Sequence, residues 1–483
     1  MNSVSMTERL RPWFTVVLLV LFAVLTVLAV VFYRERLLVD SGYYLMRMIN
    51  SGWPWVEHQR YILVLSQFLP WLGTMAELPV KEVLLLYSLN HILFPFAVFC
   101  IALFRYRQPM AGVVLLMLQT GGLTTGFFVP MFELYYAATL LVLFCLIAFV
   151  PGRVKNLPVL LVAAFLILTS HPAAIVLLTL VMVIHILKNR RGNQTFYLLM
   201  SGLVLVVAVL KLSGASSYES EKIAWMTESL LNGTFNLQWF MQRAVYMFQQ
   251  YALILILMPI TWVMLIMERK PVEVALYAGI FLIVFLLSAL NTNTPDHSRY
   301  NEQVWFPVVV LTVLPWLISV EPRNFLRAGV VLTLAFMLFF GYRTLLIVKE
   351  GNRYAERRKT IEQLNEAAYR DGGQHFVVDE ALVLPDGIPG FNWSLPIESM
   401  LLSAQNGPAS TLTVCTTVDY FYEGIHRRLN GDSYLFRRFE TEYYRNLNPA
   451  YFLLQPGLYY MLEPLPDGSG YRTYPAGETL EME

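Results

Sequence analysis

The sequence predicts an all-α polytopic membrane protein with a small C-terminal α/β domain. Hydrophobic residues make up 57% of the 483 residues, and charged residues make up only 14%. Soluble domains carry about 25% charged residues, so this chain is expected to lie in lipid. The formal net charge of +1 offers no overall basic field, and we expect no nucleic-acid partner.

About eleven apolar runs are long enough, or nearly so, to cross the roughly 30 Å hydrocarbon core of a bilayer. The first run is followed by Tyr33-Arg34-Glu35-Arg36, which is no small-residue cleavage site, so we expect a retained signal anchor. The two runs on either side of Ser170 are short. The predicted spans cover residues 13–33, 83–104, 110–129, 134–150, 157–169, 173–187, 196–212, 251–267, 272–290, 304–320 and 326–348.

Basic residues predict how these spans are oriented. Lys and Arg fall in alternate short loops, for example at Arg105 and Arg153, whereas the loops at Pro130 and Ser170 carry none. Loops rich in Lys and Arg stay on the cytoplasmic side. The N-terminus is therefore expected in the cytoplasm, and an odd number of spans puts the C-terminus outside.

The composition divides the chain into two parts. Residues 1–348 form the predicted transmembrane domain, in which the outer loops 34–82 and 214–250 are aromatic and half-apolar, as expected of interfacial helices. Residues 349–483 form the predicted extracytoplasmic α/β cap. It begins with a polar helix over residues 352–369, with Ile361 and Leu364 on one side. Strands are predicted near residues 376–378, 412–414 and 451–454, between Pro/Gly turns.

Polar residues gather at the outer ends of the predicted spans rather than inside them. Span interiors poor in ionisable residues disfavour a proton- or ion-coupled transporter. The pair Asn90 and His91 lies inside a span, where an interhelical hydrogen bond is favoured over a functional role. His171 lies in an outer turn, and a turn residue is favoured over a ligand.

Asp40 follows the first span in the segment Leu38-Val39-Asp40-Ser41-Gly42-Tyr43-Tyr44-Leu45. An apolar flank could raise its pKa and suit it to base catalysis, while capping of an interfacial helix is the alternative. His58 and Arg60 come next along the chain and could bind a phosphate or contact lipid headgroups.

Two more outer segments carry candidate residues. Glu133 ends a tight aromatic turn, where it either needs a partner or sits at a helix N-terminus. His297, Arg299 and Tyr300 precede a span on the same predicted side as Asp40. The sequence contains no CxxC or HExxH metal motif.

The first outer loop resembles that of GT-C-type membrane glycosyltransferases, in the bacterial branch related to protein mannosyltransferases and the aminoarabinose transferase. The resemblance rests on Asp-Ser-Gly-Tyr-Tyr-Leu at 40–45, Ile-Asn-Ser-Gly-Trp-Pro at 49–54 and His58, with looser likeness at Glu133 and in the segment from Arg299 to Pro307. It covers the chain to about residue 348. Gln59-Arg60-Tyr61 stands where the family usually has Lys-Pro-Pro.

The resemblance implies transfer of a sugar from a polyprenyl-phosphate donor to a glycan, lipid or protein acceptor outside the bacterial inner membrane. Asp40 would be the catalytic base, and Glu133 a second acidic residue that orients an acceptor or a divalent cation. The substrate-binding residues would be His58, Arg60, His297, Arg299 and Tyr300. A lipid-linked-sugar or polysaccharide transporter (a flippase) and a non-catalytic envelope assembly protein are the alternatives. The identity of any cofactor is left open.

Overall fold

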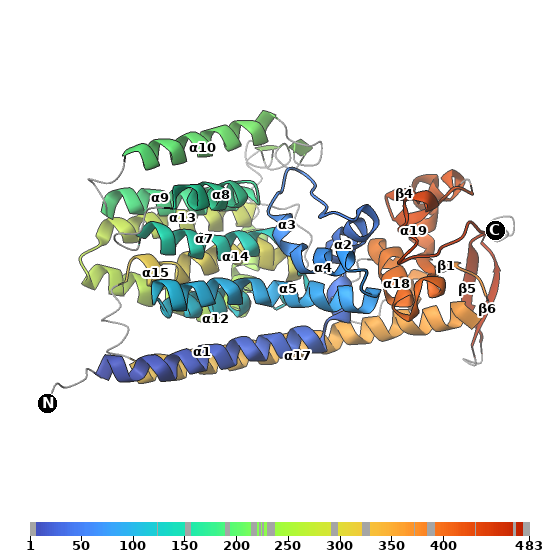
Figure 1. Ribbon diagram of the computed structural model, residues 1–483, viewed down its shortest axis with the longest axis horizontal. Helices are drawn as coiled ribbons and strands as arrows, with labels where there is room; N and C mark the ends of the chain where they lie inside the picture. The colour runs from blue at the N-terminus through green and yellow to red at the C-terminus, as the bar shows by residue number, and fades with distance from the viewer. Residues whose placement is uncertain are drawn as a thin grey trace.

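The computed structural model has a helical bundle at one end of its long axis and a domain with a small sheet at the other (Figure 1). It describes residues 6–122, 124–149, 156–188, 194–213, 237–290, 298–320, 329–370, 372–383, 392–429, 431–466 and 470–476, together with isolated residues between 220 and 228.

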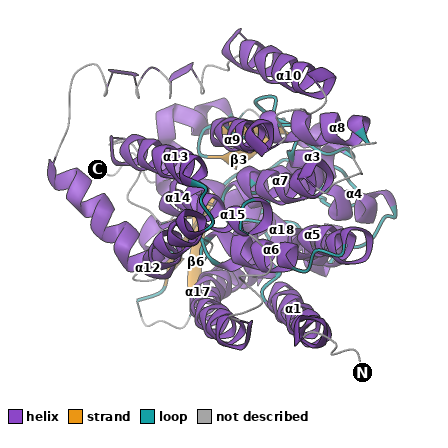
Figure 2. Ribbon diagram, turned by 90° about the vertical axis from the view of Figure 1, so that its left-hand side faces the viewer, coloured by secondary structure: helices purple, strands orange, loops and turns teal. Residues whose placement is uncertain are grey.

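The bundle consists of apolar helices that run side by side along the long axis. Figure 2 looks along this bundle and places α1 beside α17, with α10 at the outer edge. The helices of the bundle are α1 Met6–Val31, α5 Val80–Cys100, α6 Met110–Thr120, α7 Glu133–Phe149, α8 Leu157–Leu168, α9 Pro172–Lys188, α10 Gln194–Ser213, α12 Leu237–Met267, α13 Pro271–Leu290, α14 Ser298–Val313, α15 Pro315–Ile318 and the first part of α17 Gly329–Arg370.

Four of the described helices are long and apolar enough to cross a membrane, at Pro12–Val31, Val80–Tyr106, Gln194–Lys211 and Ala244–Met267. The membrane class is therefore supported, but about eleven spans are not. Several predicted spans are shorter in the structure. The run at 110–129, for example, leaves the α-helix after Thr120 and continues as a loop with the 3₁₀ turn η3 Gly126–Phe128.

The first outer loop folds into short helices that lie between the bundle and the C-terminal domain (Figure 1). These elements are the 3₁₀ turn η1 Arg34–Leu37, followed by α2 Asp40–Ser51, α3 Leu63–Ser66 and α4 Phe68–Met75. Much of the other expected interfacial loop, 214–250, lies outside the described residues, and α12 begins within it at Leu237.

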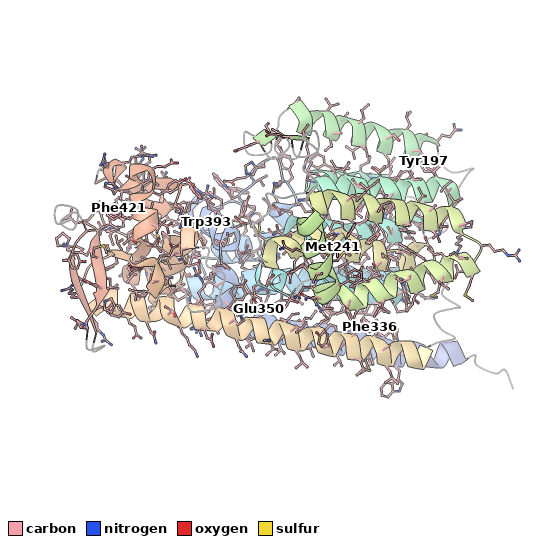
Figure 3. All side chains as sticks on the ribbon, turned by 180° about the vertical axis from the view of Figure 1, so that it is seen from behind. Tyr197, Met241, Phe336, Glu350, Trp393 and Phe421 are labelled. Atoms are coloured by element: carbon pink, nitrogen blue, oxygen red, sulfur yellow. The ribbon has the colours of Figure 1, made fainter. Side chains whose placement is uncertain are left out.

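Helix α17 joins the two ends of the molecule without a break. It has 42 residues and passes through position 349, where the sequence predicted a domain boundary. Figure 3 shows Phe336 and Glu350 on this one helix, with Trp393 and Phe421 in the C-terminal domain. Ile361 and Leu364 are buried, as expected of the apolar side of its polar half.

The C-terminal domain contains a four-stranded sheet with the strand order β2-β1-β5-β6. Strand β1 is parallel to both β2 and β5, while β5 and β6 are antiparallel. A two-stranded sheet pairs β3 with β4, and helix α18 Leu395–Ser403 packs between the main sheet and α2. The strands are β1 His375–Val378, β2 Thr413–Thr416, β3 Ser433–Arg437, β4 Glu440–Tyr443, β5 Tyr460–Pro464 and β6 Tyr471–Pro475.

The predicted strands at 376–378 and 412–414 are confirmed as β1 and β2, whereas the strand predicted at 451–454 is wrong. There the backbone N–H of Leu453 donates to Pro408 O, and its carbonyl accepts from the Gln374 side chain. These bonds hold the segment as an extended loop outside both sheets. The small α/β domain itself is as expected.

Candidate functional site

Asp40 is half-buried at the first position of α2, at the end of the bundle that faces the C-terminal domain (Figure 1). A tight turn delivers it there, because the N–H of Ser41 donates to Leu38 O at 3.3 Å. Val39 occupies φ 59° and ψ −124° in this turn. These angles match the first central position of a type II′ turn, which favours glycine. A β-branched residue there is strained, and such strain is often found at functional sites.

The glycine of the Asp-Ser-Gly segment has a packing reason. A Cβ atom on Gly42 would lie 2.4 Å from the carbonyl oxygen of Leu37 and 3.4 Å from Ile397 of α18. Only glycine lets the first turn of α2 approach the preceding backbone this closely.

Arg60 and Glu133 form an ion pair across 73 positions of sequence, with Arg60 Nη1 2.7 Å from Glu133 Oε1. The turn that carries Arg60 has positive φ values at His58 (52°) and Gln59 (57°), and the N–H of Arg60 closes it on Glu57 O at 2.9 Å. Two successive positive φ angles without glycine are uncommon. They aim the Arg60 side chain at the first residue of α7.

The Tyr44 phenol lies within the electrostatic field of several candidate residues. Burial raises the pKa of the Tyr44 phenol, and the nearby charges of Glu133, Glu57 and Asp40 raise it further, while Arg60 opposes them. All four charges therefore act on one phenol, which keeps its proton at neutral pH. Of the residues singled out from sequence, Arg60 and Glu133 are in direct contact, and Asp40 is close enough for its charge to act on the same phenol.

Glu57 belongs to this cluster and was not among the predicted site residues. Its Oε1 accepts the indole N–H of Trp55 at 2.9 Å and the hydroxyl of Tyr43, and Tyr44 Oη lies 3.5 Å from Oε2. Burial, followed by the hydrogen bond to Glu57, raises the pKa of Tyr43 to about 12. The sequence did offer a signal for Glu57, because this carboxylate stands two residues after Trp55 in an aromatic outer loop.

Arg36 is a second residue that sequence reasoning missed. Its side chain is fully buried and donates to the carbonyl of Ser88 at 2.8 Å and to the Ser88 hydroxyl at 2.9 Å. Its Nη2 also contacts His91 Nδ1, and its guanidinium lies 4.5 Å from the centre of the Phe127 ring. Arg36 thus fixes the segment before Asp40 to α5.

Glu302 and Arg343 close the loop that leads to Glu133. Glu302 is buried and accepts backbone N–H groups of the segment 124–126 at 2.6–3.1 Å. Arg343 donates to Thr120 O at 2.6 Å and to Thr124 Oγ1 at 2.8 Å. An arginine well inside the apolar run 326–348 was the missed signal, and the hydrogen bonds of Arg343 are those of a loop anchor.

Two polar residues weighed at the sequence level act in packing. The Asn90 amide donates to Leu65 O at 2.8 Å and Ser66 O at 3.0 Å, so it ties α5 to the outer loop. His171 Nδ1 accepts the N–H of Ala173 at 3.2 Å, at the start of α9. Both contacts agree with the structural roles that were favoured.

The side chains of the remaining predicted residues lie outside what the structure describes. His297 is not among the described residues, and Arg299 and Tyr300 are described only as backbone in the first turn of α14. Within the described ranges, no group of three or more His, Cys, Asp or Glu residues could hold a metal ion. The divalent cation implied by the resemblance therefore has no described ligand set, and no chemical step is assigned to it.

Comparison of this chain with protein-family models, curated proteins and solved structures finds no match.

Proposed function

We propose that this protein is an integral-membrane glycosyltransferase that moves a sugar from a polyprenyl-phosphate donor to an acceptor outside the membrane. The observation that carries the proposal is the ion pair of Arg60 with Glu133, whose charges act together with that of Asp40 on the Tyr44 phenol. The three charged residues come from separate segments of the chain, at the end of the apolar bundle that faces the C-terminal domain. The lipid tail of such a donor would lie along the apolar bundle, and its charged head would lie at the charged residues.

The reaction needs few catalytic groups, because a lipid-linked phosphate is already a good leaving group and does not require strong protonation. The Asp40 carboxylate takes the proton of the acceptor hydroxyl as that oxygen bonds to the anomeric carbon of the sugar. The bond between the anomeric carbon and the phosphate oxygen breaks, and its electron pair leaves with the polyprenyl phosphate. The proton remains on Asp40 until it is released to water.

The other residues of the cluster supply charge and orientation. Arg60 offers a planar donor fork to the phosphate, and His58 lies in the same turn. Glu133 holds Arg60 in place by the ion pair, and it lines the site as the second carboxylate. Tyr44 keeps its proton and is a hydrogen-bond donor for the developing phosphate charge. Arg299 and Tyr300 are proposed as further donor contacts from the start of α14.

The proposal places the protein in the bacterial inner membrane with a cytoplasmic N-terminus and a periplasmic C-terminus. It includes about eleven spans, because the shorter apolar helices run beside the four long ones (Figure 1). Helix α1 begins at one end of the long axis and strand β6 lies at the other, which fits an odd number of spans. Labelling of single cysteines with an impermeant reagent in spheroplasts tests the orientation, and protection of a cysteine at position 380 would contradict it.

The decisive experiment is transfer by purified protein in lipid vesicles supplied with radiolabelled polyprenyl-phosphate sugars and an acceptor lysate. We expect one donor to be consumed and its label to appear in a glycan, lipid or protein product. Movement of intact donor between the leaflets without consumption would establish the flippase alternative instead. If no donor is consumed or moved across a broad panel, the assembly-protein alternative replaces the proposal.

A further inference from the structure

The segment that delivers Asp40 is anchored on three different parts of the fold. Glu35 Oε1 accepts from Arg358 of α17 at 2.7 Å, and Arg36 is bound to α5. The backbone N–H of Val39 donates to the hydroxyl of Ser394 at 3.0 Å, from the C-terminal domain 355 residues downstream. This third anchor is the one beside Asp40.

The strained residue is also the residue that makes this contact. Val39 holds a backbone conformation that favours glycine, at φ 59°. Strain of this kind persists only when the surrounding structure fixes it. Asp40 is the next residue, so release of Val39 would turn the Asp40 side chain away from its present direction.

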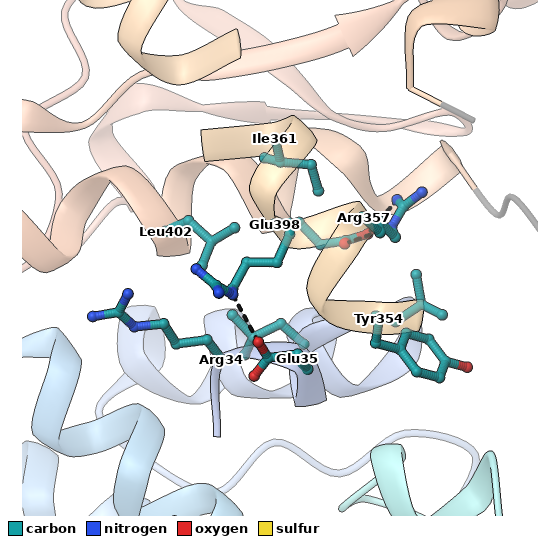
Figure 4. A pocket seen from close by; sticks show the side chains of 10 residues that line it. Arg34, Glu35, Tyr354, Arg357, Ile361, Glu398 and Leu402 are labelled. Atoms are coloured by element: carbon teal, nitrogen blue, oxygen red, sulfur yellow. Dashed lines mark hydrogen bonds and ion pairs between the residues drawn. The ribbon is translucent and has the colours of Figure 1, made fainter. Parts of the chain in front are cut away.

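Ser394 is itself fixed by buried partners. Its hydroxyl donates to Glu398 Oε1 at 2.8 Å, and Glu398 is paired with Arg357 of α17 at 3.0 Å. Figure 4 shows Arg357 and Glu398 beside the pocket between η1, α17 and α18. The pocket has room for about one water molecule, at about 10 Å³.

We propose that Ser394, held by Glu398 and Arg357, is a positioning residue for Asp40. The C-terminal domain then serves as a part of the active site that sets the direction of the base through the backbone of Val39. The effect on sugar transfer rests on the proposed function, whereas the effect on the Val39 turn does not.

Ser394→Ala removes the acceptor of the Val39 N–H, and Ser399→Ala is its matched control. Both serines are fully buried, and the Ser399 hydroxyl accepts the N–H of Val414 at 2.9 Å within the C-terminal domain. Hydrogen–deuterium exchange of the full-length protein in lipid nanodiscs measures the two sites separately. Ser394→Ala should speed exchange in residues 38–43 by about ten-fold or more, because a buried hydrogen bond is lost. Ser399→Ala should speed exchange only in residues 412–416.

Val39→Gly separates positioning from general destabilisation, because glycine holds this backbone conformation without strain. Ser394→Ala should lower turnover by about ten-fold or more while leaving the half-saturating donor concentration within about two-fold, since a misdirected base affects the chemical step. The double variant Val39→Gly/Ser394→Ala should recover most of that turnover. If Ser394→Ala yields no folded protein, the double variant should restore folding.

Unchanged exchange of residues 38–43 in Ser394→Ala would overturn the proposal. So would unchanged turnover of Ser394→Ala in a wild type that transfers sugar, or a double variant that stays as impaired as Ser394→Ala. A wild type that transfers no sugar defeats the proposed function alone. The exchange data then still decide whether Ser394 fixes the Val39 turn.

Discussion

Arg60 lies in the first outer loop and Glu133 begins α7, and their side chains meet at 2.7 Å with only 18% and 8% of their surfaces exposed. The pair closes the loop that carries His58 onto the helix bundle. Because Glu133 is so little exposed, loss of Arg60 would leave a buried carboxylate without its ion-pair partner. The contact therefore fixes the position of the outer loop relative to α7, and it pairs one positive charge with one negative charge at the candidate site.

Asp40→Asn should lower sugar-transfer turnover by about 10²–10⁴-fold, because asparagine keeps the size of the side chain but cannot accept the proton. Membrane insertion and donor binding should be preserved. Asp379→Asn is the control, since Asp379 is an exposed carboxylate of the C-terminal domain that caps a 3₁₀ turn. Wild-type turnover of Asp40→Asn in reconstituted vesicles would leave Asp40 as a helix-capping residue and remove the catalytic assignment.

Arg60→Ala and Glu133→Gln should each lower thermal stability, and the double variant should lose less than the sum of the two. Removing one partner strands a buried charge or donor, while removing both does not, so we expect a coupling of about 1–3 kcal/mol. Arg60→Ala should also raise the donor concentration needed for half-saturation by about ten-fold or more, because a charge-assisted phosphate contact is lost. Strictly additive stability changes would show that the pair is not coupled.

Local sequence pattern was sufficient for the elements that carry their own signal. Apolar length predicted α1 and α5, and a polar segment with Ile361 and Leu364 on one side predicted the second half of α17, where both residues are buried. Asp40 and Arg60 were singled out because each is a charged residue next to an apolar outer segment, and their roles stay predictions.

The features that were missed depend on partners far away in sequence. Glu302 is explained by N–H groups of a loop 176–178 residues earlier, and Arg36 by Ser88, 52 residues later. A strand was predicted at 451–454, but the segment that pairs with β1 is 460–464, through Phe376 and Tyr460. No local pattern states which of two apolar segments takes the free edge of a strand.

Gly42→Ala should disrupt the Asp40 site, whereas Gly341→Ala should be tolerated. The new Cβ at position 42 would meet a backbone oxygen at 2.4 Å, and a backbone atom cannot move aside as a side chain can. Apart from the chain neighbours and the nearby backbone of its own helix, position 341 has no described atom within 4 Å of the added Cβ, and alanine favours a helix by about 1 kcal/mol over glycine. Thermal unfolding and transfer measured on both variants provide the check. Equal behaviour of the two would show that the close approach of α2 to Leu37 is not required.

The C-terminal domain should lose stability as the pH falls below about 6.5, the usual pKa of histidine. Burial lowers the pKa of His375, whose Nε2 bonds Gln455 O at 2.8 Å. Between its lowered pKa and 6.5 the unfolded chain binds a proton that the folded domain does not, so stability rises with pH there. The titration of this group should lower the free energy of unfolding by at most about 1.4 kcal/mol for each pH unit of acidification. Thermal unfolding at several pH values measures this change. His375→Phe should weaken the dependence, and an unchanged pH profile would assign it to another group.

The C-terminal domain is joined to the bundle by the continuous helix α17 and not by a flexible linker. Its 42 residues extend over roughly 63 Å at 1.5 Å per residue. One residue inserted near position 349 would therefore rotate everything beyond it by about 100° about the helix axis, and Ser394 would no longer face Val39. Seven inserted residues amount to nearly two full turns, so they would restore the angular phase but lift the domain by about 10 Å. If Ser394 positions Asp40 as we propose, the direction of Asp40 depends on the number of residues in helix α17, which begins at the other end of the bundle.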